Sequence, residues 1–588
     1  MPSGKHSKFF LGKYDFHKVG LVLGAAVFIT MLAIPAPSSM DDSSFDVIYP
    51  RLPSDVKDMI SQEFGDVNDD NFGEFMAYSK GIMVSVSLKS SSIISEDSYK
   101  ISSSGYDVPV SLHDIIRKQS KAQISVLAIA LLMAVWWITE AIPVPVTALL
   151  PAVLLPSLGV CHYRYSLFPG FFPSFEQYAH YLIFLFLGGF VIAASMRKWG
   201  LDKRISLNIL RIFGTKPSRI ILGFMVATAF LSMWISNTAT TALMMPVALA
   251  VLTQAGVRPG KSVFGLGLML SIAYAASIGG LGTLIGTPPN GIAVGFIAQF
   301  TGKEITFADW LKIGFPMVLI FLPVAWRYIL WRCPPEISEI SGGKGVIMEN
   351  LHQLGKLSRG EKTTLFVFVF TAVAWATRSS IQIGDFTLFY GWSTWLGGYL
   401  SFVHDSTISV LAIIMLFLLP VGKGKFTMDW DTANKYVPWG TLILFGGGLT
   451  LGKAIANTGL SSWIASFLSL FGSLDILFLI FMIAALSAIL SEVTSNTATS
   501  SMLMPVMFAM GIALNKDPIT FMITSAVATS MVFALPVATP PNAIVFGTGY
   551  VKIEKMARIG ILLDIIGIIV WSLVVYFIIG LSFGLVNV

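Results

Sequence analysis

Two copies of one polar tripeptide interrupt apolar stretches of this chain. The first copy is Ser236-Asn237-Thr238 in SMWISNTATTALMMP, and the second is Ser495-Asn496-Thr497 in SEVTSNTATSSMLMP, 259 residues later. Hydroxyl and amide oxygens are suitable ligands for a small cation, and amide N–H groups at a helix start bind a carboxylate. The two tripeptides therefore predict paired sites for a cation and a small anion.

A proline motif is repeated as well. Thr287-Pro288-Pro289-Asn290 returns as Thr539-Pro540-Pro541-Asn542 at an offset of 252. Consecutive prolines remove amide donors and disfavour helix in the residue before them, so each motif predicts a broken helix. The carbonyl groups freed by such a break can coordinate a cation: those of Gly286, Thr287, Ala538 and Thr539.

Each tripeptide lies between two short apolar arms, which are Ile220–Ile235 and Ala242–Leu252 in the first copy. This pattern predicts a re-entrant hairpin whose tip lies near the middle of the bilayer, where a non-helical backbone must be buried or line a cavity. One such tripeptide on its own is more simply a helix cap or an interhelical hydrogen bond. Two copies, each with its own Pro-Pro break, indicate an internal duplication and a binding site.

The composition excludes a water-soluble globular protein. Hydrophobic residues make up 54% of the chain, charged residues 12%, and the mean hydropathy is +0.74. A helix needs roughly 20 apolar residues to cross a bilayer, and we expect about eleven crossings in an all-α polytopic membrane protein. The net charge of +6 comes from basic residues between apolar stretches, so no nucleic-acid partner is expected. The histidines form no metal-ligand spacing and no phosphate-binding loop is present, which argues against a metalloenzyme or an ATP-driven pump.

The chain divides into a first helix, an insert, two repeats and a linker. The insert is acidic, with 14 Asp and Glu against 5 Lys and Arg over residues 41–116, and alternation at residues 84–88 suggests a strand. A small folded insert and a mostly unstructured loop both remain open, and the apolar run after the N-terminus is either a retained helix, which we prefer, or a signal peptide. The predicted parts are a cytoplasmic N-terminus and first helix (1–40), an extracytoplasmic insert (41–118), a first repeat (119–331), a cytoplasmic linker (332–362) and a second repeat (363–588).

Charge predicts that the repeats are inverted. Residues 197–219 hold seven Lys and Arg and one Asp, whereas the equivalent residues 456–478 hold only Asp475. Because basic residues gather on the cytoplasmic side, one copy faces the cytoplasm and the other does not. With an odd number of crossings, the N-terminus is predicted in the cytoplasm and the C-terminus outside it.

The chain resembles the divalent anion:sodium symporter family over nearly its whole length outside the insert. Besides the two duplicated motifs, the resemblance rests on LLMAVWWITEAIPVPVTALLP at 131–151 and VPWGTLILFGGGLTLGKAIANTGLS at 437–461. It implies a homodimer in a plasma or inner membrane, with a scaffold and a moving transport domain that work as an elevator.

The resemblance also implies roles for individual residues. One sodium site would be lined by Ser232, Ser236, Asn237 and Gly286, and the other by Ser491, Ser495, Asn496, Ala538 and Pro540. The substrate carboxylates would contact Asn237, Thr238, Asn496, Thr497 and Thr539.

The function that follows is sodium-coupled symport of a C4-dicarboxylate such as succinate, malate or fumarate, with sodium as coupling ion and no organic cofactor. Intact Ser-Asn-Thr triplets favour carboxylate over sulfate as the substrate. The alternatives are a sodium-independent exchanger, a proton-coupled carrier that uses Glu492, a citrate- or sulfate-preferring carrier, an anion channel, and an enzyme or receptor that acts through the insert. Glu492 either couples protons or pairs with a buried donor to hold the hairpin, and Arg378 is expected as an interfacial anchor.

Overall fold

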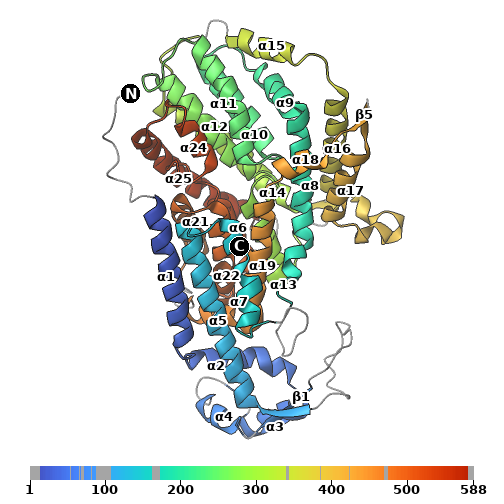
Figure 1. Cartoon of the computed structure of the whole chain (residues 1–588), viewed down its shortest axis with the longest axis vertical. Coiled ribbons are helices and arrows are strands. Elements are labelled where there is room, and N and C mark those ends of the chain that lie inside the picture. The colour runs from blue at the N-terminus through green and yellow to red at the C-terminus, as the bar shows by residue number, and fades with distance from the viewer. Residues whose placement is uncertain are drawn as a thin grey trace. The chain divides into compact units, whose positions relative to one another are not determined.

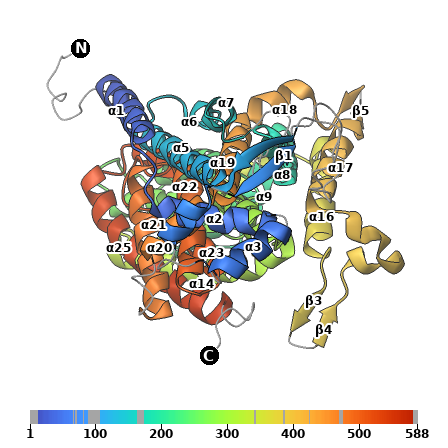
Figure 2. The ribbon, with the colours of Figure 1, turned by 90° about the horizontal axis from the view of Figure 1, so that it is seen from below.

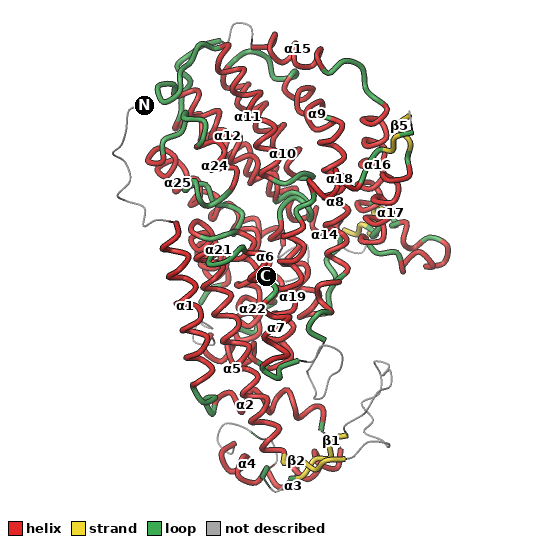
Figure 3. Tube along the Cα trace, in the orientation of Figure 1, coloured by secondary structure: helices red, strands yellow, loops and turns green. Residues whose placement is uncertain are grey.

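The computed structural model is mostly helical (Figures 1 and 3), which confirms the predicted all-α membrane fold. It describes residues 13–52, 54–64, 67, 72–80, 82–87, 107–161, 173–339, 343–383, 386–422, 424–468 and 474–579. The chain forms two compact units. One unit comprises Met1–Gln177, Gly447–Gly472 and Ile512–Lys516, and the other comprises Tyr178–Gly446, Ser473–Gly511 and Asp517–Val588.

In the first unit, the two long helices α1 (Lys13–Ala33) and α5 (Leu112–Thr139) pack side by side (Figures 1 and 2). After its first turns α1 has no polar face, and Val19, Val22 and Ile29 remain exposed although the helix packs on α5, which suits a helix in a membrane. The short helices α6 (Val144–Thr147) and α7 (Leu150–Ser157) and the 3-10 turn η2 (Glu176–Ala179) follow α5.

The described part of the insert is folded. Helices α2 (Ser39–Ile48), α3 (Ser54–Phe64) and α4 (Phe72–Tyr78), with the turn η1 (Tyr49–Arg51), enclose a core in which Ile60 and Phe75 are fully buried. Strand β1 (Met83–Ser87) pairs antiparallel with β2 (Asp107–Ser111), which leads directly into α5. The strand expected at residues 84–88 is therefore confirmed as far as Ser87, and Leu88 lies outside the described residues.

A buried polar network joins this insert to α5 and to the C-terminal end of α19 (Trp439–Thr458). Gln123 of α5 is fully buried, donates to Thr458 O at 2.9 Å and lies 3.0 Å from the hydroxyls of both Ser43 and Ser44 of α2. Gln119 donates to Asn457 O at 3.1 Å. Because the last carbonyls of a helix have no partner within it, the two glutamines cap α19.

From α8 onward, the predicted first repeat lies in the second unit, where an amphipathic arm, a hairpin and a broken helix follow in succession. Helices α10 and α11 contact each other and both pack on α12. Pro217 and Pro288 occupy the first turns of α10 and α13, where a missing amide costs nothing. The elements are α8 (Tyr181–Trp199), α9 (Leu201–Leu210), α10 (Pro217–Ser232), α11 (Asn237–Gln254), α12 (Val263–Gly280), α13 (Pro288–Thr301) and α14 (Phe307–Arg332).

The second repeat has the same order from α19 to α25, although its arm α20 belongs to the first unit. Its elements are α19, α20 (Leu460–Leu468), α21 (Ile476–Val493), α22 (Asn496–Ala513), α23 (Pro518–Ala528), α24 (Pro540–Phe546) and α25 (Ile553–Val574), followed by a π-helical turn (Val575–Ile579). The elements between α14 and α19 are α15 (Gly343–Gln353), α16 (Arg359–Ala376), β3 (Ile381–Ile383), β4 (Phe386–Phe389), η3 (Trp392–Thr394), η4 (Leu396–Phe402), α17 (Asp405–Leu418), β5 (Pro420–Gly422), β6 (Lys425–Phe426) and α18 (Trp430–Tyr436).

Seven helices of the described part are long and apolar enough to cross a membrane, and five shorter apolar helices accompany them. The seven include α5, α12 and α21, and the shorter ones include α10 and α23. Helix length and composition do not place a bilayer, so the count of about eleven crossings, the depth of the hairpins and the inversion of the repeats stay predictions.

Arg378, expected as an interfacial anchor, is buried and lies in a partly exposed ion-pair cluster that joins α14, α16 and α17. Its guanidinium lies 2.7 Å from Glu304 and 2.7 Å from Asp405. His404 Nε2 lies 2.9 Å from the same Glu304 carboxylate, and this hydrogen bond, with the nearby Arg378 charge, lowers the pKa of Glu304 to about 2. Asp405 in turn accepts from the Phe307 amide at 2.9 Å, at the start of α14.

We expect Gln123→Leu to destabilise the protein by about 1–3 kcal/mol, because Thr458 O and the two serine hydroxyls would lose a buried partner. Thermal unfolding of the purified protein in detergent measures the change. Ser61→Ala is the control, since Ser61 makes only an exposed contact with the Tyr49 hydroxyl. Equal melting temperatures for Gln123→Leu and wild type would contradict the role of the network.

Candidate functional site

The first polar tripeptide lies where α10 ends and α11 begins. Ser236 is the N-cap of α11, and its hydroxyl accepts from the Ala239 amide at 3.4 Å. Ser232 Oγ lies 2.7 Å from Asn237 Oδ1 and 2.7 Å from Ala276 O of α12. One buried serine thus joins both hairpin arms to the helix that breaks later in the repeat.

The second tripeptide has the same geometry at the junction of α21 and α22. Ser491 Oγ lies 3.0 Å from Asn496 Oδ1 and 2.7 Å from Thr529 O, just after α23. The hydroxyl groups of Thr494 and Thr499 are hydrogen-bonded to each other across the same junction. The duplicated sequence therefore builds a duplicated junction of serine, asparagine and backbone carbonyl.

The proline motifs break helices as predicted. Helix α12 ends at Gly280 and α13 begins at Pro288, while α23 ends at Ala528 and α24 begins at Pro540. The carbonyls of each break are bound by the asparagine of its motif, whose role the sequence analysis left unassigned. Asn290 Nδ2 donates to Gly280 O at 3.0 Å and Thr283 O at 2.8 Å, and Asn542 Nδ2 to Leu535 O at 3.0 Å and Val532 O at 3.5 Å.

These two asparagines also present unused oxygens. Within the described residues, Asn290 Oδ1 and Asn542 Oδ1 are buried and accept no hydrogen bond. A buried amide oxygen without a donor costs free energy unless another positive group binds it. The position of each oxygen beside a broken helix suits a cation.

The remaining predicted residues differ in exposure. Gly286, Ala538 and Thr539 are buried, Thr497 is half-buried, and Thr238 and Pro540 are exposed. The Thr539 hydroxyl accepts from the Asn542 amide at 3.3 Å and so caps α24, besides its predicted contact with substrate.

The two repeats interlock within the second unit. Helix α24 of the second repeat contacts α11 and α12 of the first (Figure 1), and α13 of the first repeat contacts α23 of the second. Phe300 of α13 stacks on Phe508 of α22 with ring centroids 4.6 Å apart. Within each repeat, direct hydrogen bonds join predicted site residues. Between the repeats, the contacts of α24 with α11 and α12 and of α13 with α23 bring the two sets of residues together.

The donor set favours a small hard cation and a carboxylate. The predicted site residues offer hydroxyl, amide and carbonyl oxygens but no charged side chain, and α11 and α22 start at the two tripeptides, where the partial positive charge of a helix start favours an anion. Among the described residues, no cluster of three His, Cys, Asp or Glu could hold a metal ion. The site therefore has no groups for transition-metal chemistry, and neutral oxygens are what sodium accepts.

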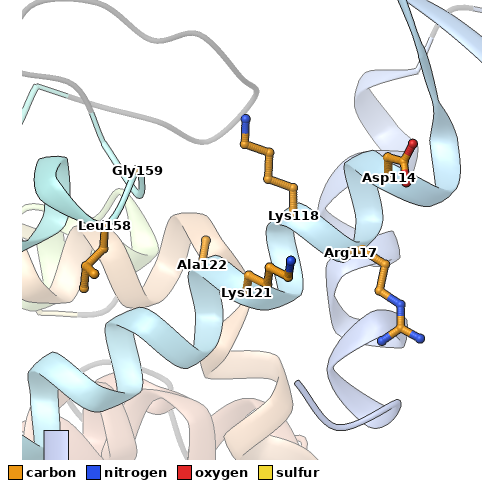
Figure 4. Close-up of a pocket in the computed structure, with 7 residues that line it drawn as sticks. All are labelled: Asp114, Arg117, Lys118, Lys121, Ala122, Leu158 and Gly159. Atoms are coloured by element: carbon orange, nitrogen blue, oxygen red, sulfur yellow. The ribbon is translucent and has the colours of Figure 1, made fainter. Parts of the chain in front are cut away.

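A pocket of about 430 Å³ lies elsewhere, in the first unit (Figure 4). It is lined by Asp114, Arg117, Lys118, Lys121, Ala122, Leu158 and Gly159. Arg117 forms an ion pair with Asp41 at 3.3 Å, so the pocket marks the charged end of α5 where the insert docks. It contains none of the predicted site residues.

Comparison with known proteins adds independent information. Residues 117–582 match the family described as "Sodium:sulfate symporter transmembrane region". A protein of Staphylococcus saprophyticus named sodium-dependent dicarboxylate transporter SdcS is 42% identical over 465 residues, covering 77% of this chain and 86% of that protein. The protein of the same name from Staphylococcus aureus strain MRSA252 is 40% identical over 473 residues, covering 78% and 86%.

Solved structures are similar at a greater distance. The YdaH transporter of Alcanivorax borkumensis is 13% identical with a TM-score of 0.46, covering 69% of this chain and 86% of that chain. MtrF of Neisseria gonorrhoeae is 13% identical with a TM-score of 0.48, covering 68% and 82%.

We expect Gly286→Ala to weaken the first site. A Cβ at position 286 would lie 2.5 Å from Gly280 O, the carbonyl that Asn290 binds, so the broken helix would have to shift. Overpacking of this kind costs about 1–3 kcal/mol, which corresponds to about a tenfold or larger loss of cation affinity. The cation dependence of ligand binding by the purified protein measures it.

Gly345→Ala is the matched control, because a Cβ there meets no atom within 4 Å. An unchanged cation dependence in Gly286→Ala would remove this position from the site.

Proposed function

Because this chain belongs to the sodium:sulfate symporter family, we propose that it is a secondary transporter that moves C4-dicarboxylates such as succinate, malate or fumarate together with sodium ions. It is a multi-pass membrane transporter and not an enzyme, and sodium is its coupling ion. The choice of dicarboxylate over sulfate or citrate is supported by relatives that are named sodium-dependent dicarboxylate transporters.

The duplicated junction carries this proposal. Ser232 with Asn237, and Ser491 with Asn496, place matching side-chain oxygens beside matching backbone carbonyls. We assign one sodium site to each junction and the substrate carboxylates to the asparagines and threonines at the tips. The sodium ligands would be Ser232, Ser236, Asn237 and Gly286 in one site and Ser491, Ser495, Asn496, Ala538 and Pro540 in the other, with Thr238, Thr497 and Thr539 on the substrate.

Electrostatics sets an order of binding. The site's side chains are neutral, so a dianion entering it alone would leave two negative charges in a medium of low dielectric constant. Two bound sodium ions would offset that charge. Sodium should therefore bind before the dicarboxylate, and succinate binding that is unchanged without sodium would contradict this order.

The transport cycle follows from the duplication. Two inverted repeats can form alternative pathways to the two sides of the membrane from one shared site. We propose that the protein works as a homodimer with an elevator movement, with its N-terminus in the cytoplasm and its C-terminus outside.

Uptake of radiolabelled succinate into proteoliposomes tests the function. An inward sodium gradient should drive uptake, and an equal potassium or choline gradient should not. Sodium-independent uptake would instead indicate an exchanger or, with a proton gradient, a proton-coupled carrier. Citrate and sulfate in place of succinate define the substrate, and currents that exceed coupled turnover would indicate a channel.

We expect Asn237→Ala and Asn496→Ala each to lower sodium-driven uptake by about ten- to a hundredfold, because each removes a predicted ligand oxygen and its hydrogen bond to the serine of the junction. Initial rates in proteoliposomes measure the loss. Asn350→Ala on α15 is the control, since Asn350 donates only to a carbonyl of its own helix. Wild-type uptake by either site variant would exclude that asparagine from the site.

A further inference from the structure

The second repeat unwinds earlier than the first. Helix α23 ends at Ala528, just before Thr529, whose carbonyl contacts Ser491 as the Ala276 carbonyl contacts Ser232, whereas α12 continues past Ala276 to Gly280. In the first repeat the next amides stay in helical turns, with Leu281 N bonded to Ile278 O at 3.2 Å and Gly282 N to Gly279 O at 2.9 Å. The corresponding amides of the second repeat need other partners.

Two carboxyl groups supply those partners. Glu492 of α21 accepts from the Ala534 amide at 2.9 Å and the Leu535 amide at 3.1 Å. Asp564 of α25, which is 8% exposed, accepts from the Phe533 amide at 2.8 Å. Three consecutive backbone amides of the unwound segment are thus bound by side chains from two other helices.

Glu492 and Asp564 thus bind neighbouring amides of one segment, and we call them the carboxyl pair. Of the two alternatives for Glu492, the contacts match a residue that pairs with buried donors.

The first repeat has apolar residues at both corresponding places. Met233 corresponds to Glu492 at the offset of 259, and Val318 corresponds to Asp564 when LysIleGly at 312–314 is aligned with ArgIleGly at 558–560. The structure supports that alignment, since a Cβ at Gly314 would lie 2.2 Å from Leu281 O and a Cβ at Gly560 2.2 Å from Phe533 O.

Met233 and Val318 enclose the position that corresponds to Ala534. A Cβ at Gly282 would lie within 3.1 Å of both side chains. The first repeat therefore packs apolar side chains around a helical turn at the place where the second repeat binds an unwound backbone with acids.

Residues 533–535, whose amides the two acids bind, lead directly to the proposed second sodium site. Leu535 O accepts from Asn542 Nδ2 at 3.0 Å and from the Ala538 amide at 3.2 Å, so the amide side of this segment is bound by acids and its carbonyl side by the broken-helix motif. Glu492 also follows Ser491 in the chain, whose hydroxyl lies 2.7 Å from Thr529 O.

Building on the proposed function, we propose that Glu492 and Asp564 are positioning residues that hold residues 533–535 in the conformation in which the second site binds sodium. The first site lacks this contribution, because Met233 and Val318 occupy the corresponding positions there. The two sodium sites are therefore unequal, and loss of the pair weakens only the second.

The test is the sodium dependence of succinate uptake at saturating succinate. Asp564→Leu removes the acceptor of the Phe533 amide and should raise the half-saturating sodium concentration about tenfold, with the maximal rate at high sodium changed less. Glu492→Gln removes the charge and one acceptor and should shift the same concentration upward. Asp564→Asn keeps an acceptor for the Phe533 amide and should match wild type.

Asp475→Asn is the matched control, because Asp475 accepts two amides at the other end of α21, from Leu477 at 2.8 Å and Phe478 at 3.3 Å. It should leave sodium half-saturation unchanged. A merely structural role for the pair would lower the maximal rate without moving the half-saturating concentration, and that result would overturn the proposal. If Asp564→Leu does not fold, Glu492→Gln with a wild-type sodium curve overturns it equally.

Hydrogen exchange at the amides of residues 533–535 separates this proposal from the proposed function. Protection in wild type that is lost in Asp564→Leu supports the proposal that the carboxyl pair holds residues 533–535. This support would remain if wild-type uptake needed no sodium, because that outcome would overturn only the proposed symport. Unchanged protection in Asp564→Leu would overturn the proposal that the carboxyl pair holds this segment.

Discussion

The fold depends on satisfying backbone groups where helices break inside an apolar protein. A carbonyl or amide left unpaired in that environment costs several kcal/mol, so each break needs a defined set of side-chain partners. Asn290 and Asn542 bind the carbonyls of the two breaks, and Ser232 and Ser491 contact the carbonyls that precede them. The side chains that satisfy the backbone groups at the helix breaks therefore also shape the oxygen-lined positions that we assign to sodium.

Duplication builds this arrangement twice, and the differences between the copies carry information. Paired sites on inverted repeats allow one site to open toward either side of the membrane. The first copy has the apolar residues Met233 and Val318 where the second has Glu492 and Asp564. This difference leaves the order of the helices unchanged, but it changes the local chemistry and the backbone conformation that these side chains support.

Sequence patterns located the breaks and the hairpin junctions because proline and the polar tripeptides act through local chemistry, and the duplication repeated the signal. The acidic partner of Glu492 was missed. Asp564 is an acidic residue within an apolar run, and this was the available signal in the sequence. The backbone amide that it binds, that of Phe533, lies 31 residues away. The fold of the insert stayed open for the same reason, since its core depends on Phe45 and Phe75 meeting across the chain. The ion pairs of Arg378 were not predicted, because Glu304 precedes α14 and Asp405 starts α17, in other segments of the chain. Its place at the membrane interface stays a prediction.

Segments outside the repeats hold the arms that lead to the hairpins. Arm α9 is fixed by Arg204, which donates to Leu354 O and Gly355 O at 3.0 Å and pairs with Glu361. Arm α20 begins just after the end of α19, where Gln123 binds Thr458 O, and α2 of the insert contacts α20. The family match begins only at residue 117, so most of the insert lies outside the region shared with the family. Its buried contacts nevertheless make it part of the first unit, where it supports one arm as the linker supports the other.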